Sequence, residues 1–150
     1  MQKYIKKIIY NVLITGGIYM DKIVHFEIPV DNLERAQQFY KKFFGWNIVK
    51  TEMPNMEYHI IHTVETDKKG MPKSSGAING GMMKRMKKGE TPVLVIKVKS
   101  LDDTLKQIQQ AGVKIVMPKM QVGNMGLYAR FMDPEGNIMG IWQDLPKGGK

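Results

Sequence analysis

A histidine and a glutamate stand two residues apart in an apolar, aromatic stretch near the start of the chain. The stretch is KIVHFEIPVDN, residues 22–32, and the two residues are His25 and Glu27. Side chains alternate across a strand, so both are predicted to lie on one face of a sheet. There they could bind a metal, act as a base with its partner, or hydrogen-bond a ligand. Simple hydrogen bonding to neighbouring residues is the fourth interpretation.

Later segments carry further side chains that suit ligand binding. Tyr128 and Arg130 are predicted to share a strand face, where a ring, a hydroxyl and a guanidinium would suit an anionic or planar ligand. Tyr58 lies in an earlier strand, although aromatic residues in strands more often belong to the core. His59 and His62 are three residues apart, so they are predicted to face opposite ways, at the surface or rim, and not to hold one ion together.

The composition limits the classes of function that these residues can serve. A chain of 150 residues suits one domain with its own core. It has no cysteine, which excludes disulfides, thiolate metal sites and thiol nucleophiles and is compatible with a cytoplasmic protein. The net charge of +9 comes from lysines spread along the chain, and their densest cluster, KRMKK at 84–88, lacks aromatic residues. We therefore predict no nucleic-acid partner.

The first 19 residues carry early lysines and then an apolar run. Asn11 and the pair Gly16-Gly17 interrupt that run, and it is shorter than the roughly 20 apolar residues that a membrane span needs. No small-x-small cleavage site follows. We predict that residues 1–19 are an extension, and a true start at Met20 is one interpretation of it. We also predict that residues 147–150 are a tail and that no membrane is a partner.

Between these ends, the pattern predicts two similar series of elements. The first has a strand at 23–30, a helix capped by Asp31 or Asn32 and ended by Gly45, and strands at 46–53, 56–66 and 75–85. The second has a strand at 93–98, a helix capped by Ser100 and ended by Gly112, and strands at 113–120, 126–133 and 136–143.

Comparison of the two series gives the predicted architecture. Tyr58 corresponds to Tyr128, and GAINGGM at 76–82 corresponds to GNIMGIW at 136–142, which aligns Gly80 with Gly140. The chain therefore reads as an α+β domain over residues 20–146 made of two βαβββ modules, 20–86 and 91–146. Packed together, the modules would place their helices outside and leave a curved, sheet-lined cleft inside, where ligands bind preferentially.

The segments HFEIPVDNLERAQQFYKKFFGW and FMDPEGNIMGIWQ resemble the vicinal oxygen chelate superfamily. This superfamily includes glyoxalase I, extradiol dioxygenases, fosfomycin-resistance enzymes and bleomycin-resistance proteins. The resemblance covers residues 21–144 and looks closest to the uncharacterised proteins related to lactoylglutathione lyase. It implies the glyoxalase/bleomycin-resistance fold, a small-molecule ligand and a homodimer.

In the metal-dependent members, the resemblance implies an ion held by one ligand from the first and one from the last strand of each module. These positions fall on His25, Val93, Gly80 and Gly140, and only the first has a coordinating side chain. Zinc, iron or nickel needs three or more protein ligands. We therefore predict that the protein has no metal and no other cofactor, and that the two glycines leave open space beneath Trp142.

The combined prediction is a metal-independent member of the superfamily that binds a small anionic or aromatic molecule in the cleft between the modules. The candidate ligand-binding residues are His25, Glu27, Tyr58, Gly80, Val93, Tyr128, Arg130, Gly140 and Trp142. The alternative is an enzyme related to glyoxalase I (lactoylglutathione lyase) or a dioxygenase. Its catalysis would use a non-standard metal site or acid–base chemistry by His25 with Glu27 as partner.

Overall fold

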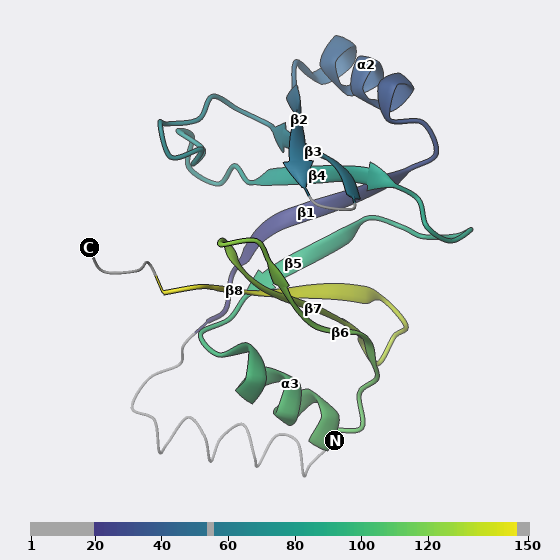
Figure 1. Ribbon diagram of the computed structural model, residues 1–150, viewed down its shortest axis with the longest axis vertical. Helices are drawn as coiled ribbons and strands as arrows, with labels where there is room; N and C mark the ends of the chain where they lie inside the picture. The colour runs from purple at the N-terminus through teal and green to yellow at the C-terminus, as the bar shows by residue number, and fades with distance from the viewer. Residues whose placement is uncertain (1–19, 54–55, 147–150) are drawn as a thin grey trace.

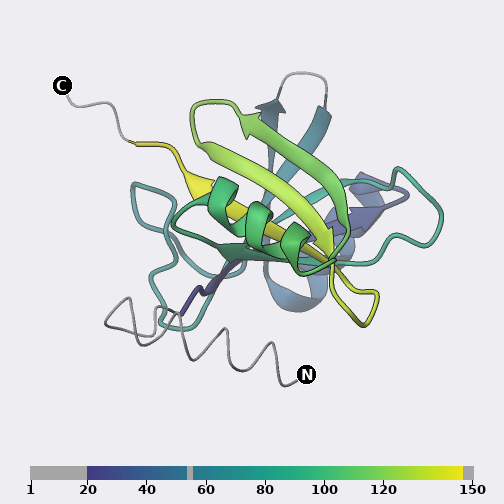
Figure 2. The same cartoon turned by 90° about the horizontal axis from the view of Figure 1, so that it is seen from below.

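One curled sheet with two helices outside it forms the body of the molecule (Figure 1). The computed structural model describes residues 20–53 and 56–146, so the predicted extension 1–19 and the tail 147–150 lie outside the described residues. Within the described part, no helix is long and apolar enough to cross a membrane. Figure 2 shows the curl of the sheet, with the second helix lying across its outer side.

The elements follow the predicted order. The first series is β1 (Ile23–Val30), α2 (Leu33–Phe44), β2 (Asn47–Met53), β3 (Met56–His62) and β4 (Asn79–Lys84). The second is β5 (Val93–Lys97), α3 (Leu101–Gln110), β6 (Ile115–Val122), β7 (Gly126–Met132) and β8 (Ile138–Asp144). The third and fourth strands of the first series are shorter than predicted, because residues 63–78 form a loop with only an isolated bridge between Thr66 and Pro72.

The strand order shows that the two series are equivalent. All eight strands form one sheet in the order β2-β3-β4-β1-β5-β8-β7-β6. Counted from the centre of the sheet outwards, each half has the first strand of its series, then the fourth, then the third and finally the second. In each half the first and last strands pair in parallel, and the two halves meet where β1 pairs antiparallel with β5. The predicted fold class, an α+β fold of two βαβββ modules with the helices outside a curved sheet, is confirmed.

Both helices have the predicted kind of N-cap. The Asn32 side chain accepts a hydrogen bond from the backbone N–H of Arg35, and the Ser100 hydroxyl accepts one from that of Asp103. The first helix ends at Gly45, whose φ of 69° is left-handed and favours glycine. The second ends at Ala111, one residue before the predicted Gly112.

Each helix covers its own hydrophobic cluster on the outer side of the sheet. The buried members of the first cluster are Val30, Ile48, Ile61 and Met82, beneath α2. Those of the second are Val98, Ala129 and Ile141, beneath α3, together with Leu101 of the helix itself. Because strand side chains alternate, these clusters occupy every second position of the central strands. The positions between them point to the opposite side, which we call the inner face.

Candidate functional site

His25 and Glu27 both lie on the inner face. Phe26, which stands between them, and Ile28, which follows Glu27, point to the other side and pack against the cluster beneath α2. The neighbouring strands continue this face, since His25 pairs with Asn79 and Val95, and Glu27 pairs with Gly81 and Val93. The predicted site residues of the two modules therefore meet along the central strands of the sheet.

Glu27 joins the first module to the second through two side chains of β7. The Tyr128 hydroxyl donates a hydrogen bond of 2.6 Å to Oε2 of Glu27, and Nη2 of Arg130 forms an ion pair with the same oxygen. Nε of Arg130 also donates to the Tyr128 hydroxyl at 2.8 Å. Glu27 is only 8% exposed, so the structure depends on Arg130 to neutralise this buried charge.

The electrostatics of this cluster keep the Tyr128 phenol protonated and the Arg130 guanidinium charged. Burial raises the pKa of Tyr128, and the negative charge of Glu27 raises it further, so the phenol keeps its proton. Burial acts to lower the pKa of Arg130, but the neighbouring Glu27 and Tyr128 outweigh it and the net change is upward. The cluster is thus a neutral phenol held between a carboxylate and a guanidinium.

The second hydrogen-bonded pair of the inner face is His25 with Tyr58. Nε2 of His25 lies 2.8 Å from the Tyr58 hydroxyl, with the direction of the bond set by the imidazole tautomer. Burial lowers the pKa of His25, and the charge of Glu27 only partly opposes this. Burial and the same charge raise the pKa of Tyr58. At neutral pH the pair is therefore an uncharged imidazole and a protonated phenol.

The two tyrosines occupy equivalent places in the repeat, each over a glycine. Tyr58 pairs with Met83 and Tyr128 pairs with Trp142 in the matching strands. A Cβ on Gly140 would come within 2.9 Å of the Tyr128 hydroxyl, and one on Gly81 would overlap the Tyr58 hydroxyl and ring carbons. Glycine at both positions is what allows the hydroxyls to reach the middle of the inner face.

The glycine equivalent to Gly140 is thus Gly81, and the alignment with Gly80 was wrong by one residue. A Cβ on Gly80 would overlap the Phe26 ring, which lies on the outer side of the sheet. The sequence alignment matched Gly76 and Ile78 with Gly136 and Ile138, but Ile78 lies just before β4 whereas Ile138 is the first residue of β8. Because the side-chain period of a strand is two, a slip of one residue reverses the face.

Trp142 and Val93 also lie on the inner face, but the open space predicted beneath Trp142 is filled. Trp142 pairs with Tyr128, donates from Nε1 to Asp144 at 2.7 Å, and covers Gly126, where a Cβ would overlap the indole ring. The Tyr128 hydroxyl takes the space beside Gly140. Val93 is 4% exposed and lies opposite Glu27, where it supplies an apolar contact only.

The residues of the inner face do not fit a divalent metal. Val93, Gly81 and Gly140 have no donor atom, and Oε2 of Glu27 is already bound by Tyr128 and Arg130. Across residues 20–53 and 56–146, no three His, Asp or Glu side chains are grouped so that they could hold an ion. A catalytic zinc or iron site requires such a group. The guanidinium of Arg130 supplies the positive charge beside Glu27.

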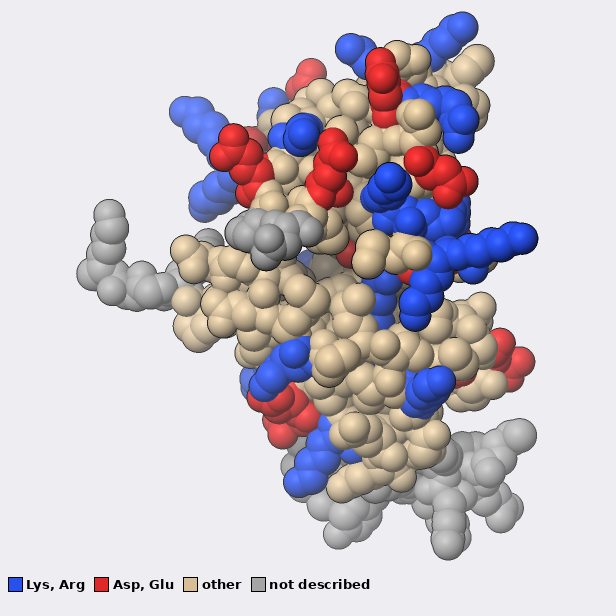
Figure 3. Space-filling model, turned by 45° about the vertical axis from the view of Figure 1, so that its right-hand side comes forward, with Lys and Arg blue, Asp and Glu red and all other residues tan. Residues whose placement is uncertain are grey.

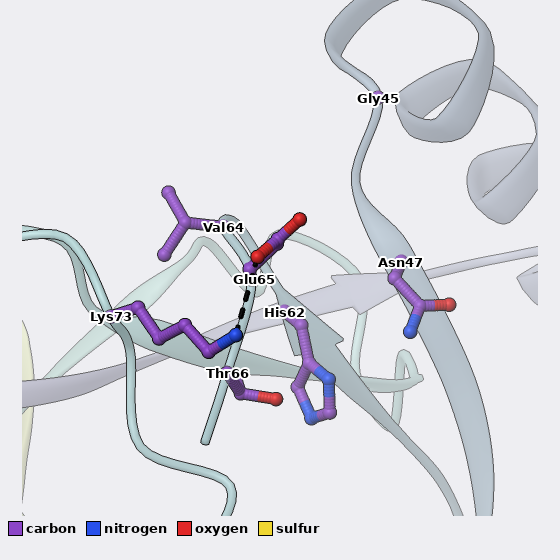
Figure 4. Close-up of a pocket in the computed structure, with 7 residues that line it drawn as sticks. All are labelled: Gly45, Asn47, His62, Val64, Glu65, Thr66 and Lys73. Atoms are coloured by element: carbon purple, nitrogen blue, oxygen red, sulfur yellow. Dashed lines mark hydrogen bonds and ion pairs between the residues drawn. The ribbon is translucent and has the colours of Figure 1, made fainter.

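The other two histidines lie apart from this cluster. His59 is 7% exposed and is part of the outer side of the sheet, opposite Met82, so its prediction as a surface or rim residue was wrong. His62 lines a depression of about 390 Å³ with Asn47 and Thr66, beside the ion pair of Lys73 and Glu65 (Figure 4). Sequence spacing gave no signal for this depression, because its residues come from β2, β3 and the following loop.

Comparison with known proteins identifies the class that this fold and inner face define. Residues 22–141 match the family model of the Glyoxalase/Bleomycin resistance protein/Dioxygenase superfamily. The match spans most of the chain, so the protein belongs to this superfamily. No curated protein matches the sequence at a significant level.

Solved structures with the same fold share little sequence with the chain. A methylmalonyl-CoA epimerase from Mycobacterium tuberculosis is 17% identical, with a TM-score of 0.61 over 83% of this chain and 88% of that one. A hypothetical protein from Bacillus halodurans is 12% identical, with a TM-score of 0.64 over 88% and 100%. An epimerase variant from Streptomyces coelicolor, in complex with 2-nitronate-propionyl-CoA, is 16% identical, with a TM-score of 0.62 over 85% and 100%. At these identities the likeness establishes the fold alone.

Proposed function

We propose that the protein binds a small anionic or aromatic molecule on its inner face without a metal ion. The observation that carries this proposal is the free hydrogen-bonding capacity of the ion pair between β1 and β7. Both hydrogen bonds that the Glu27 carboxylate accepts use Oε2, and those that the Arg130 guanidinium donates use Nε and Nη2. Among the described residues, Oε1 of Glu27 and Nη1 of Arg130 have no protein partner.

The same pair defines the chemistry of the ligand. Nη1 of Arg130 can donate to a carboxylate or carbonyl oxygen, while Oε1 of Glu27 can accept from a hydroxyl or amine. Cζ of the Arg130 guanidinium lies 5.6 Å from the centre of the Tyr128 ring, so the two groups also make a cation–π contact. With Trp142 on the same face, this arrangement suits a small molecule that has a flat body and a polar head containing both an acceptor and a donor.

Thermal-shift measurements with chelator present test the proposal, because a ligand that binds only the folded state raises Tm. The probes are hydroxylated aromatic carboxylates such as salicylate and 4-hydroxyphenylacetate. The double variant Glu27→Gln, Arg130→Met removes both charges together, and Lys68→Met is a surface control. The proposal predicts a Tm increase that the control keeps and the double variant loses. An increase that requires added zinc would contradict it, as would one that the double variant keeps after Arg35 on the outer side of the molecule has also been replaced by Met.

Acid–base catalysis by His25 is a second candidate, favoured by one observation. The imidazole is held by Tyr58 and has a lowered pKa, so it is unprotonated at neutral pH, as a general base must be. Turnover of a hemithioacetal or a catechol, abolished by His25→Ala but kept by His62→Ala, would support an enzyme. Equal rates in both variants would exclude His25 as the base.

A further inference from the structure

A second depression lies on the outer side of the molecule, between α2 and the end of β1. Its volume is about 460 Å³, within the range of small-molecule sites. Ile28, Val30 and Ala36 form its apolar floor, and Phe39 and Tyr40 form an aromatic wall. We call it the outer pocket. None of the residues predicted to bind ligand on the inner face lines it.

The aromatic wall of the outer pocket is both exposed and rigid. Phe39 is 48% exposed, and Phe43 and Phe44, with which it packs on the same helix, are exposed as well. The Phe39 ring contacts the Tyr40 ring edge to face, with 5.2 Å between their centres. The Tyr40 ring in turn stacks on the Trp46 ring, nearly parallel to it, with 4.8 Å between their centres. A ring held in place by its neighbours offers an apolar surface to a ligand with little loss of side-chain entropy.

The charges around the outer pocket leave one cation unmatched. Arg85 is fully engaged, since Nε pairs with Asp31 at 3.0 Å and the two Nη atoms donate to the carbonyls of Pro29 and Glu90. Arg35 also lines the pocket, and within the described residues its guanidinium has no partner. Asp31 and Arg85 neutralise each other, so the net charge of the lining is positive.

The surroundings reinforce this positive charge. Figure 3 shows Lys and Arg side chains gathered at the height of the connection between β4 and β5, the connection that contributes Arg85 and Pro92 to the pocket. A chain with a net charge of +9 also attracts anions as a whole. The outer pocket therefore combines an apolar floor, an exposed ring and a free guanidinium.

We propose that the outer pocket is a second ligand site, which binds a flat aromatic monoanion independently of the inner face. The ring of the ligand packs against Phe39 and the apolar floor. Its carboxylate accepts two hydrogen bonds from the Arg35 guanidinium, the geometry in which this pair is strongest. Because the proposal rests on the lining of this pocket alone, it stands whether or not the inner face binds a ligand.

Titration of the full chain with benzoate, followed by two-dimensional amide NMR, tests this proposal. The expected amide shifts lie at residues 33–40 and at Arg85, and benzamide is expected to bind more weakly than benzoate. Arg35→Met should weaken benzoate binding about threefold to tenfold, as expected for a partly exposed ion pair. Lys41→Met removes one charge from the same helix, outside the pocket, and should change binding little.

Three results would overturn the outer site. The first is an absence of shifts at residues 33–40 at millimolar benzoate. The second is equal weakening by Arg35→Met and Lys41→Met, which would mean general attraction to a basic surface. The third is loss of these shifts in the double variant Glu27→Gln, Arg130→Met, which would place the ligand on the inner face.

A second variant, Phe39→Ala, tests the aromatic wall of the pocket. It should weaken the binding of benzoate and the binding of benzamide to the same extent.

Discussion

Two tyrosine hydroxyls reach the centre of the inner face because a glycine stands beside each of them. Tyr58 lies over Gly81 and binds His25, while Tyr128 lies over Gly140 and binds Glu27. The repeat therefore places one phenol in each module at the same position but gives each a different partner. The result is an inner face with two neutral phenols, one neutral imidazole and one ion pair.

The unequal space beside the two glycines gives a prediction. Gly81→Ala should destabilise the protein by about 1–3 kcal/mol, since the new methyl group would overlap Tyr58 and force it away from His25. Gly140→Ala should have a smaller effect. The new methyl group would lie 2.9 Å from the Tyr128 hydroxyl and 3.0 Å from a ring carbon of Tyr128, and a small shift of that side chain relieves both contacts. Urea unfolding of both variants measures the difference. Equal losses of stability would contradict the arrangement described.

The buried ion pair gives a second prediction. Arg130→Met leaves the Glu27 charge without a partner and should reduce the free energy of unfolding by about 3–5 kcal/mol. The double variant Glu27→Gln, Arg130→Met removes both charges and should be clearly more stable than Arg130→Met alone. Urea unfolding of the two variants makes the comparison. A double variant no more stable than Arg130→Met alone would contradict the ion pair described.

The lowered pKa of His25 predicts how stability depends on pH. Burial places the pKa of His25 in the folded protein below its ordinary value of 6.5, so the unfolded chain binds the proton more tightly. The contribution of His25 to stability is complete above that value and is lost as the pH falls through the folded pKa. His25→Gln should therefore flatten the decline in stability below about pH 6.5. A decline identical to that of the wild type would refute this assignment.

The sequence predicted the side chains of the inner face better than their contacts. Alternation along β1 was enough to place His25 and Glu27 together, and the repeat aligned Tyr58 with Tyr128. The link between Glu27 and Tyr128 joins residues that are 101 positions apart, so no local pattern could reveal it. Gly81 was missed because a repeat alignment with no structural register cannot distinguish neighbouring residues of a strand.

At the scale of the elements, local signals predicted both helices and the order of all strands. Each helix has a capping residue, an apolar stripe and a nearby glycine, all of which are visible in the sequence. The ends of β3 and β4 were predicted less well. Residues 63–66 and 75–78 continue the polarity pattern of their strands, but tertiary pairing stops at His62 and resumes at Asn79.

The N-caps give a prediction at this scale. Asn32→Ala removes a 2.8 Å hydrogen bond to the Arg35 N–H and should cost about 1 kcal/mol of stability. Ser100→Ala removes a longer bond of 3.3 Å and should cost less. Asn32→Asp keeps an acceptor at the cap and serves as the control for Asn32→Ala. A larger loss in Ser100→Ala would show that the bond lengths do not rank the caps.

At the scale of the whole molecule, the candidate site depends on the joining of the two modules. Each module has its own core beneath its own helix, yet Glu27 comes from the first and its partners Tyr128 and Arg130 from the second. The pairing of β1 with β5 brings them together. A homodimer and a cytoplasmic location remain predictions, and light scattering of the purified protein tests the first.

Metal content tests the central claim, that the inner face works without an ion, most directly. The purified protein and its His25→Ala variant are equilibrated separately with Zn²⁺, Ni²⁺, Mn²⁺ and Fe²⁺, desalted, and analysed for metal per chain. The account predicts far less than one ion per chain, with no difference between the two proteins. One tightly held ion per chain that His25→Ala loses would contradict it.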